Sequence, residues 1–107
     1  MKTLNREVVK AQFGYEVKTT FYEDLGIAEA FGIKAVKETY KRAFKEWKEN
    51  TEYITELCMM LNWKIWEHYE SNEELAKVYN DLWMELQDWC YNNLKDDDLA
   101  YFIRTTD

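Results

Sequence analysis

Five lysines share one face of a predicted helix, in a chain whose formal net charge is -7. They recur every three or four residues, which at about 100° per residue keeps them within an arc of about 80° on the helix surface. These lysines are Lys34, Lys37, Lys41, Lys45 and Lys48. Such a stripe is either an anion-binding surface, for a nucleic acid or an acidic protein, or one half of a charge match inside the protein. We favour the internal charge match and keep anion binding as the alternative.

A second stripe, of acidic residues, follows a later predicted helix over about residues 73–93. Its members are Glu74, Asp81, Glu85 and Asp88. In an up-down-up bundle this helix runs parallel to the lysine-bearing helix, so the acidic flank of one meets the basic flank of the other. Exposed pairs contribute only about 0.2–1 kcal/mol each, so they would orient the helices rather than stabilise them. Alternatively, the acidic stripe and Asp96–Asp98 bind a basic groove on a partner protein.

The residues that support catalysis or metal binding in other proteins form no known arrangement here. His68 is the only histidine, and the two cysteines, Cys58 and Cys90, occupy apolar positions of predicted helices. Asp96–Asp98 lacks the alternation and the glycine of an EF-hand and is typical of a helix start. The sequence contains no glycine-rich phosphate loop and no nucleophile elbow. We therefore predict a protein that is not an enzyme, with no catalytic residue, no metal site and no cofactor.

Apolar residues at helical spacing organise the chain from about residue 20 onward. The pattern predicts a mainly all-α fold, a compact bundle of three long helices plus short flanking helices. We expect one domain over residues 20–107, with residues 1–19 as an N-terminal arm. The expected helices span about residues 20–31, 33–49, 52–70 and 73–93, with a short one from about residue 96.

Local signals predict where these helices begin and end. Thr20 with Glu23 is a capping-box pattern for the first helix, and Thr51 is the predicted N-cap of the third. We expect Gly32 to end the first helix as a left-handed C-cap. Gly26, inside that helix, would permit close backbone packing.

The N-terminal arm has a different pattern. Every second residue from Val9 to Val17 is apolar and the residues between are polar or glycine, which predicts a β-strand over about residues 8–18. A lone strand leaves its backbone groups unpaired. Pairing across the two-fold axis of a homodimer would satisfy them. A weaker pairing candidate is Tyr101–Arg104, and the arm is otherwise irregular or an extra helix.

Aromatic residues make up 17% of the chain, including five tryptophans. They either fill a small core with large side chains or form a partner surface, because Trp and Tyr are enriched at interface centres. Trp63 and Met60 lie off the apolar stripe of their helix, which is therefore either central in the bundle or buried in an oligomer. We take both residues as candidates for contact with a partner. A small-ligand pocket is a further alternative, lined by Trp63, Trp66, Trp83 and Trp89.

The cellular setting follows from features that the sequence lacks. The N-terminus has no apolar signal-peptide core, and no apolar run is long enough to span a membrane. Reduced core thiols suit the cytoplasm, where we expect the protein, without membrane contact. A net charge of -7 argues against a dedicated nucleic-acid-binding role, so a regulator that uses the lysine stripe is the second choice.

Short segments along the chain resemble small uncharacterised helical proteins encoded on phages and conjugative elements of gut Firmicutes. These segments are Ile27–Gly32, Arg42–Lys48, Thr55–Leu57 and Arg104–Asp107. The resemblance covers about residues 20–107 and implies a mobile-element accessory protein, without implying a reaction. We predict an acidic, non-enzymatic interaction protein, an accessory or anti-defence inhibitor that binds a host protein.

Overall fold

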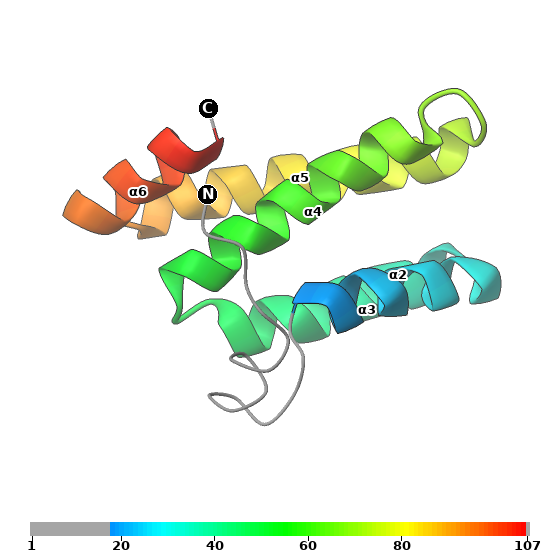
Figure 1. The fold of residues 1–107 in the computed structure, drawn as a ribbon, viewed down its shortest axis with the longest axis horizontal. Coiled ribbons are helices and arrows are strands. Elements are labelled where there is room, and N and C mark those ends of the chain that lie inside the picture. Colours follow the sequence, from blue (N-terminus) through cyan, green and yellow to red (C-terminus); the bar gives the residue numbers. More distant parts are fainter. Residues whose placement is uncertain (1–17, 107) are drawn as a thin grey trace. The chain divides into compact units, whose positions relative to one another are not determined.

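The fold is all-α across the part of the chain that the structure, a computed structural model, describes (Figure 1). That part comprises the backbone of residues 18–106 and the side chains of residues 21–106, and it contains no strand. Its helices are α2 (Lys18–Phe31), α3 (Ile33–Trp47), α4 (Thr51–His68), α5 (Glu73–Asn93) and α6 (Asp96–Thr106). The predicted fold class is therefore confirmed. Apart from its last residue, the strand predicted in the N-terminal arm lies outside the described residues.

Asparagines, rather than the predicted threonine, cap the two longest helices. The side chain of Asn50, in an extended conformation, accepts a hydrogen bond from the Tyr53 amide at 3.0 Å. Thr51 is consequently the first residue of α4, and the prediction that it is the N-cap is wrong by one position. Asn72 caps α5 in the same way, accepting from the Leu75 amide at 3.1 Å. Asparagine suits this position because its carbonyl oxygen satisfies an amide that has no partner within the helix.

The chain divides into two compact units, Met1–Ala43 and Phe44–Asp107, with the boundary inside α3. In the first unit an ion pair of 3.9 Å joins Arg42 on α3 to Asp24 on α2. Its buried apolar residues follow the predicted stripes and are Phe21, Leu25, Ala28, Val36, Tyr40 and Ala43. Phe31 shares the helical spacing of Phe21, Leu25 and Ala28, which predicts that it is buried, but it is 81% exposed at the end of α2. The predicted single domain over residues 20–107 stays a prediction.

In the second unit, α4 packs against α5, and α6 packs against both (Figure 1). The last turn of α3 also belongs to this unit, where Phe44 meets Trp89 edge to face with ring centroids 5.0 Å apart. Phe102 anchors α6, because its side chain is fully buried and contacts Tyr91 edge to face. Residues 101–104 are therefore helical, and the suggestion of a strand there is wrong.

The first half of α4 is buried on all sides. Residues 53–58 are consecutively buried, including the charged Glu56. Lys64, in the second half of α4, is buried as well. The burial of Glu56 together with its neighbours shows that α4 has almost no solvent-facing side over residues 53–58.

Two glycines, both in the first unit, have opposite structural roles. Gly32 adopts a positive φ of 116° directly after α2, and its amide donates to the Ala28 carbonyl at 3.1 Å. The predicted C-cap is confirmed, because L-residues rarely adopt such a φ. A Cβ built at Gly26 would meet nothing within 4 Å. The suggested close backbone packing at Gly26 is therefore wrong.

We expect the same substitution to have opposite effects at these two glycines. Gly26→Ala should stabilise the protein by about 0.5–1 kcal/mol, because alanine loses less backbone entropy in a helix. Gly32→Ala should destabilise it by about 1–2 kcal/mol, because the Cβ strains the left-handed backbone. Urea unfolding followed by circular dichroism measures both. Ala30→Gly, at an exposed position of α2, is the matched control and should destabilise. Destabilisation by Gly26→Ala would contradict the open space at this position.

Candidate functional site

The lysine stripe lies on α3 and the residue that follows it, and all five of its side chains are exposed. Lys48 continues the helical spacing, since its amide donates to the Phe44 carbonyl at 2.9 Å. Of the five, Lys45 and Lys48 belong to the same unit as the acidic stripe. Within the described residues of that unit, neither lysine forms an ion pair with α5. The internal charge match is thus absent for these two lysines, and for Lys34, Lys37 and Lys41 it stays a prediction.

The acidic stripe is exposed along α5, at Glu74, Asp81, Glu85 and Asp88. Asp81 pairs with Lys77, one turn earlier on the same helix, at 3.1 Å. A partner four residues away is available at little entropic cost, which explains why this pairing forms. Glu74 lies in the first turn of α5, where a negative charge interacts favourably with the helix dipole.

The structure separates the residues predicted to bind a partner or a small ligand. Met60 is fully buried, so it has no surface to offer, whereas Trp63 is 42% exposed. Trp63 and Trp83 line one cavity together. Trp66 lies at a different hollow, and Trp89 packs on Phe44. None of the hollows that the structure describes between residues 21 and 106 brings all four tryptophans together.

An exposed pair of aromatic rings surrounded by carboxylates occupies the end of α4 and the start of α5. Trp66 is 66% exposed and Tyr69 59% exposed, and their ring centroids lie 5.4 Å apart at an interplanar angle of 44°. Both rings border a hollow of about 370 Å³. A second hollow, of about 450 Å³, shares Tyr69 and Glu70 with the first and extends to Glu73. We call Trp66, Glu67, Tyr69, Glu70 and Glu73 the aromatic–acidic patch.

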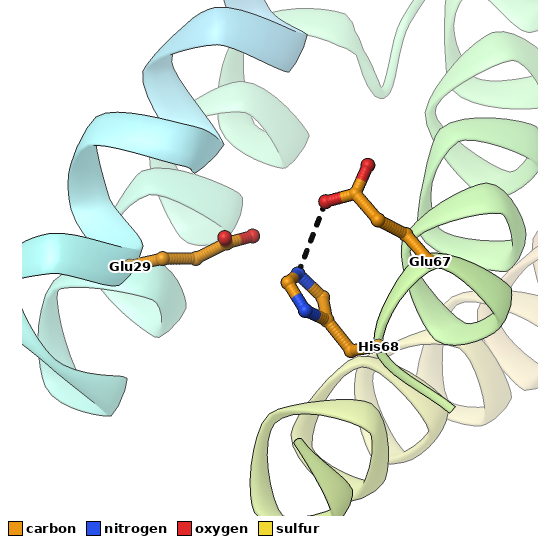
Figure 2. A group of neighbouring side chains, drawn as sticks. All are labelled: Glu29, Glu67 and His68. Carbon is orange, nitrogen blue, oxygen red and sulfur yellow. Dashed lines mark ion pairs between the residues drawn. The ribbon is translucent and has the colours of Figure 1, made fainter. Parts of the chain in front are cut away.

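One carboxylate of the patch is held by its neighbours, and two are not. Glu67 accepts a hydrogen bond from the buried Lys64 Nζ at 3.0 Å, and its Oε2 lies 3.1 Å from His68 Nε2 (Figure 2). His68 in turn stacks on Tyr79 at 5.9 Å between ring centroids. Among the described residues, Glu70 and Glu73 form no ion pair. Both have carboxylates open to a cation from outside.

Sequence reasoning missed this patch, because the apolar spacing of Leu61, Ile65 and Tyr69 assigns Tyr69 to the buried face of α4. The helix ends at His68, and the Tyr69 amide turns back to the Trp66 carbonyl at 3.4 Å. Tyr69 keeps right-handed helical backbone angles as the C-cap of α4, and its ring is nevertheless 59% exposed. The useful signal in the sequence was Trp66 and Tyr69 at a spacing of three residues, next to a run of glutamates.

The two cysteines are free and buried in the second unit. Burial raises the pKa of Cys58 to about 12; the neighbouring Cys90 adds to the rise and a hydrogen bond from Trp83 reduces it. Burial alone raises the pKa of Cys90 to about 12. Thiols with such pKa values are poor nucleophiles, because the thiolate is the reactive form.

Comparisons with protein-family models, curated proteins and solved structures find no match to this chain. The resemblance to mobile-element proteins therefore stays a prediction. In the described part of the chain, every helix is too short or too polar to cross a membrane.

We expect both thiols to be inert in the folded protein and to lower its stability in alkali. A thiol reagent at pH 8 should label neither cysteine until a denaturant is added. The pKa of each thiol in the folded protein, about 12, exceeds the ordinary value of 9.0. The stabilisation of the folded state by its neutral thiols is therefore complete below pH 9. It is lost as the pH rises toward 12, because the thiols ionise more readily in the unfolded chain. Over this range each thiol should lower the free energy of unfolding by about 1.4 kcal/mol per pH unit.

The Cys58→Ala/Cys90→Ala variant is the control for the other groups that titrate in alkali. Its unfolding free energy should fall less steeply above pH 9 than that of the natural chain. Rapid labelling of the native protein, or identical pH profiles for the two chains, would contradict the raised pKa values.

Proposed function

We propose that this protein is a non-enzymatic interaction protein, which binds an arginine-containing segment of a partner protein at the aromatic–acidic patch. One observation carries the proposal: Trp66 and Tyr69 are exposed side by side, next to the unpaired carboxylates of Glu70 and Glu73. Exposed aromatic clusters of this kind are typical of interaction sites.

Arginine fits the patch better than other side chains do. Its planar guanidinium stacks on aromatic rings, with a gain of about 0.5–1 kcal/mol at an exposed site. The same group donates two parallel hydrogen bonds to one carboxylate. A lysine ammonium is a compact point charge and matches a carboxylate less well. The net charge of -7 attracts a basic partner over a longer range and accelerates association.

The predicted context suggests the class of partner. If the chain is a mobile-element accessory protein, a host protein with a basic, nucleic-acid-binding segment would supply the arginines. The acidic surface would then compete with nucleic acid for that segment. The proposal rests on charge and on aromatic exposure, and it requires no reaction.

The test is calorimetric titration of the full chain with an arginine-rich peptide and with the same peptide carrying lysine. We expect tighter binding of the arginine peptide. Trp66→Ala/Tyr69→Ala should weaken it about tenfold or more, equivalent to about 1.4 kcal/mol. Glu70→Gln/Glu73→Gln should also weaken it, because both carboxylates lose their charge. Equal binding of the two peptides would count against recognition of arginine.

The matched control is Glu85→Gln/Asp88→Asn, which removes the same charge from the exposed face of α5 away from the patch. It should change the affinity by less than about twofold at physiological salt, where charges beyond about 8 Å are screened. If it weakens binding as much as Glu70→Gln/Glu73→Gln does, the patch is the wrong site and the acidic stripe of α5 is favoured.

A second candidate function, nucleic-acid binding, is favoured by the exposure of all five lysines of the stripe. Binding of this kind should weaken steeply with salt. The logarithm of the binding constant should fall with the logarithm of the salt concentration, with a slope of about -0.7 per phosphate contacted on a single strand. Lys37→Glu/Lys41→Glu should abolish it. A filter-binding titration that detects no affinity for DNA or RNA even at low salt would remove this candidate.

A further inference from the structure

Helix α2 has two apolar faces. The buried face carries Phe21, Leu25 and Ala28. The other carries Ile27 and Phe31, which lie one helical turn apart and are 61% and 81% exposed, with the exposed Ala30 beside them. At about 100° per residue, the centres of the two faces are about 130° apart around the helix axis. The core of the first unit therefore uses one side of α2 and leaves a second apolar side open to solvent.

This second side, Ile27, Ala30 and Phe31, is called the outer face of α2. Single exposed apolar residues are ordinary on a protein surface, whereas neighbouring ones mark contact sites. Phe31 is the most exposed large apolar side chain in the described part of the chain. Burial of Ile27 and Phe31 against a partner is favourable, because the removal of apolar area from water is the main driving force of protein association.

Opposite charges border the two ends of the outer face. Glu23 is exposed on α2 one turn before Ile27, and Lys34 is exposed in the first turn of α3, three residues after Phe31. Among residues 21–106, neither of these two charges forms an ion pair. The outer face thus has a free carboxylate at one end and a free ammonium at the other.

This arrangement is complementary to a second copy of itself. In an antiparallel pair of α2 helices around a two-fold axis, Ile27 of one copy packs beside Phe31 of the other. Glu23 lies four residues before Ile27 and Lys34 three residues after Phe31, so the same axis brings Glu23 of one copy opposite Lys34 of the other. Every contact in a two-fold interface occurs twice. A parallel pair would instead place Glu23 beside its own copy, where like charges repel.

We propose that two copies of this chain associate through the outer face of α2, as an antiparallel two-fold dimer in which Ile27 packs on Phe31 between flanking Glu23–Lys34 ion pairs. The apolar contacts supply the affinity. The ion pairs set the direction of the two helices, because exposed pairs contribute little stability. The outer face shares no residue with the aromatic–acidic patch, so this proposal and arginine binding fail or succeed independently.

Sedimentation equilibrium of the full chain over a range of concentrations tests the association. We expect the measured mass to rise from 13.0 kDa toward twice this value as the concentration increases. Phe31→Ser should weaken dimerisation at least about tenfold and leave the circular dichroism spectrum unchanged, because the ring is 81% exposed. The matched control is Met84→Ser, which replaces an exposed apolar side chain of α5 and should leave the dimer intact.

Charge reversal tests the direction of the pair. Glu23→Lys alone, or Lys34→Glu alone, places like charges opposite each other at both ends and should weaken the dimer about threefold or more. The double variant Glu23→Lys/Lys34→Glu restores opposite charges and should recover most of the affinity of the natural chain. Failure of the double variant to dimerise better than the single variants would overturn the antiparallel arrangement.

Two other outcomes overturn the proposal. One is a dimer that Phe31→Ser leaves intact, because the interface then lies elsewhere. The other is a mass of one chain at every concentration. If Phe31→Ser also lowers the free energy of unfolding of such a monomer in urea, the outer face is covered within a single chain instead.

Discussion

The packing of α4 against α5 is the contact on which the rest of the second unit depends. In proteins most of the stability of a helix comes from packing of its apolar face rather than from its own hydrogen bonds. The apolar stripes of the two helices supply this packing: Leu57 and Leu61 on α4 and Tyr79 and Leu86 on α5 are all fully buried. Each such side chain contributes about 1.5–3 kcal/mol, far more than any of the exposed ion pairs.

The position of α6 then determines what α4 exposes. Tyr101 of α6 lies near the charges of Glu52 and Glu56, and burial followed by these charges raises its pKa. Four residues later, Thr105 and Thr106 border the cavity beside Asn62. Helix α6 ends at Thr106, and Trp66 and Tyr69, further along α4, face solvent. A buried segment, a cavity and an exposed aromatic patch thus follow one another along α4.

Several charged side chains of the second unit pair with neighbours on their own helix. Asp81 pairs with Lys77 on its own helix, and Glu67 pairs with Lys64 and His68 on α4. Neighbours within one turn meet at small entropic cost, whereas a pair between helices must also hold two long side chains in one geometry. Matching stripes on two helices are therefore weak evidence that the helices are adjacent.

The sequence by itself determined which segments are helical. The limits of α5 and the C-cap at Gly32 were predicted from it, because spacing, capping and a left-handed turn depend on neighbours a few residues apart. The burial of Met60 and the exposure of Tyr69 were not predictable in this way, and neither was the separation of Trp66 from the cavity that Trp63 and Trp83 line. They depend on which helix covers which face and where that helix ends. Only the tertiary structure decides this, because contacts between residues far apart in the chain set it.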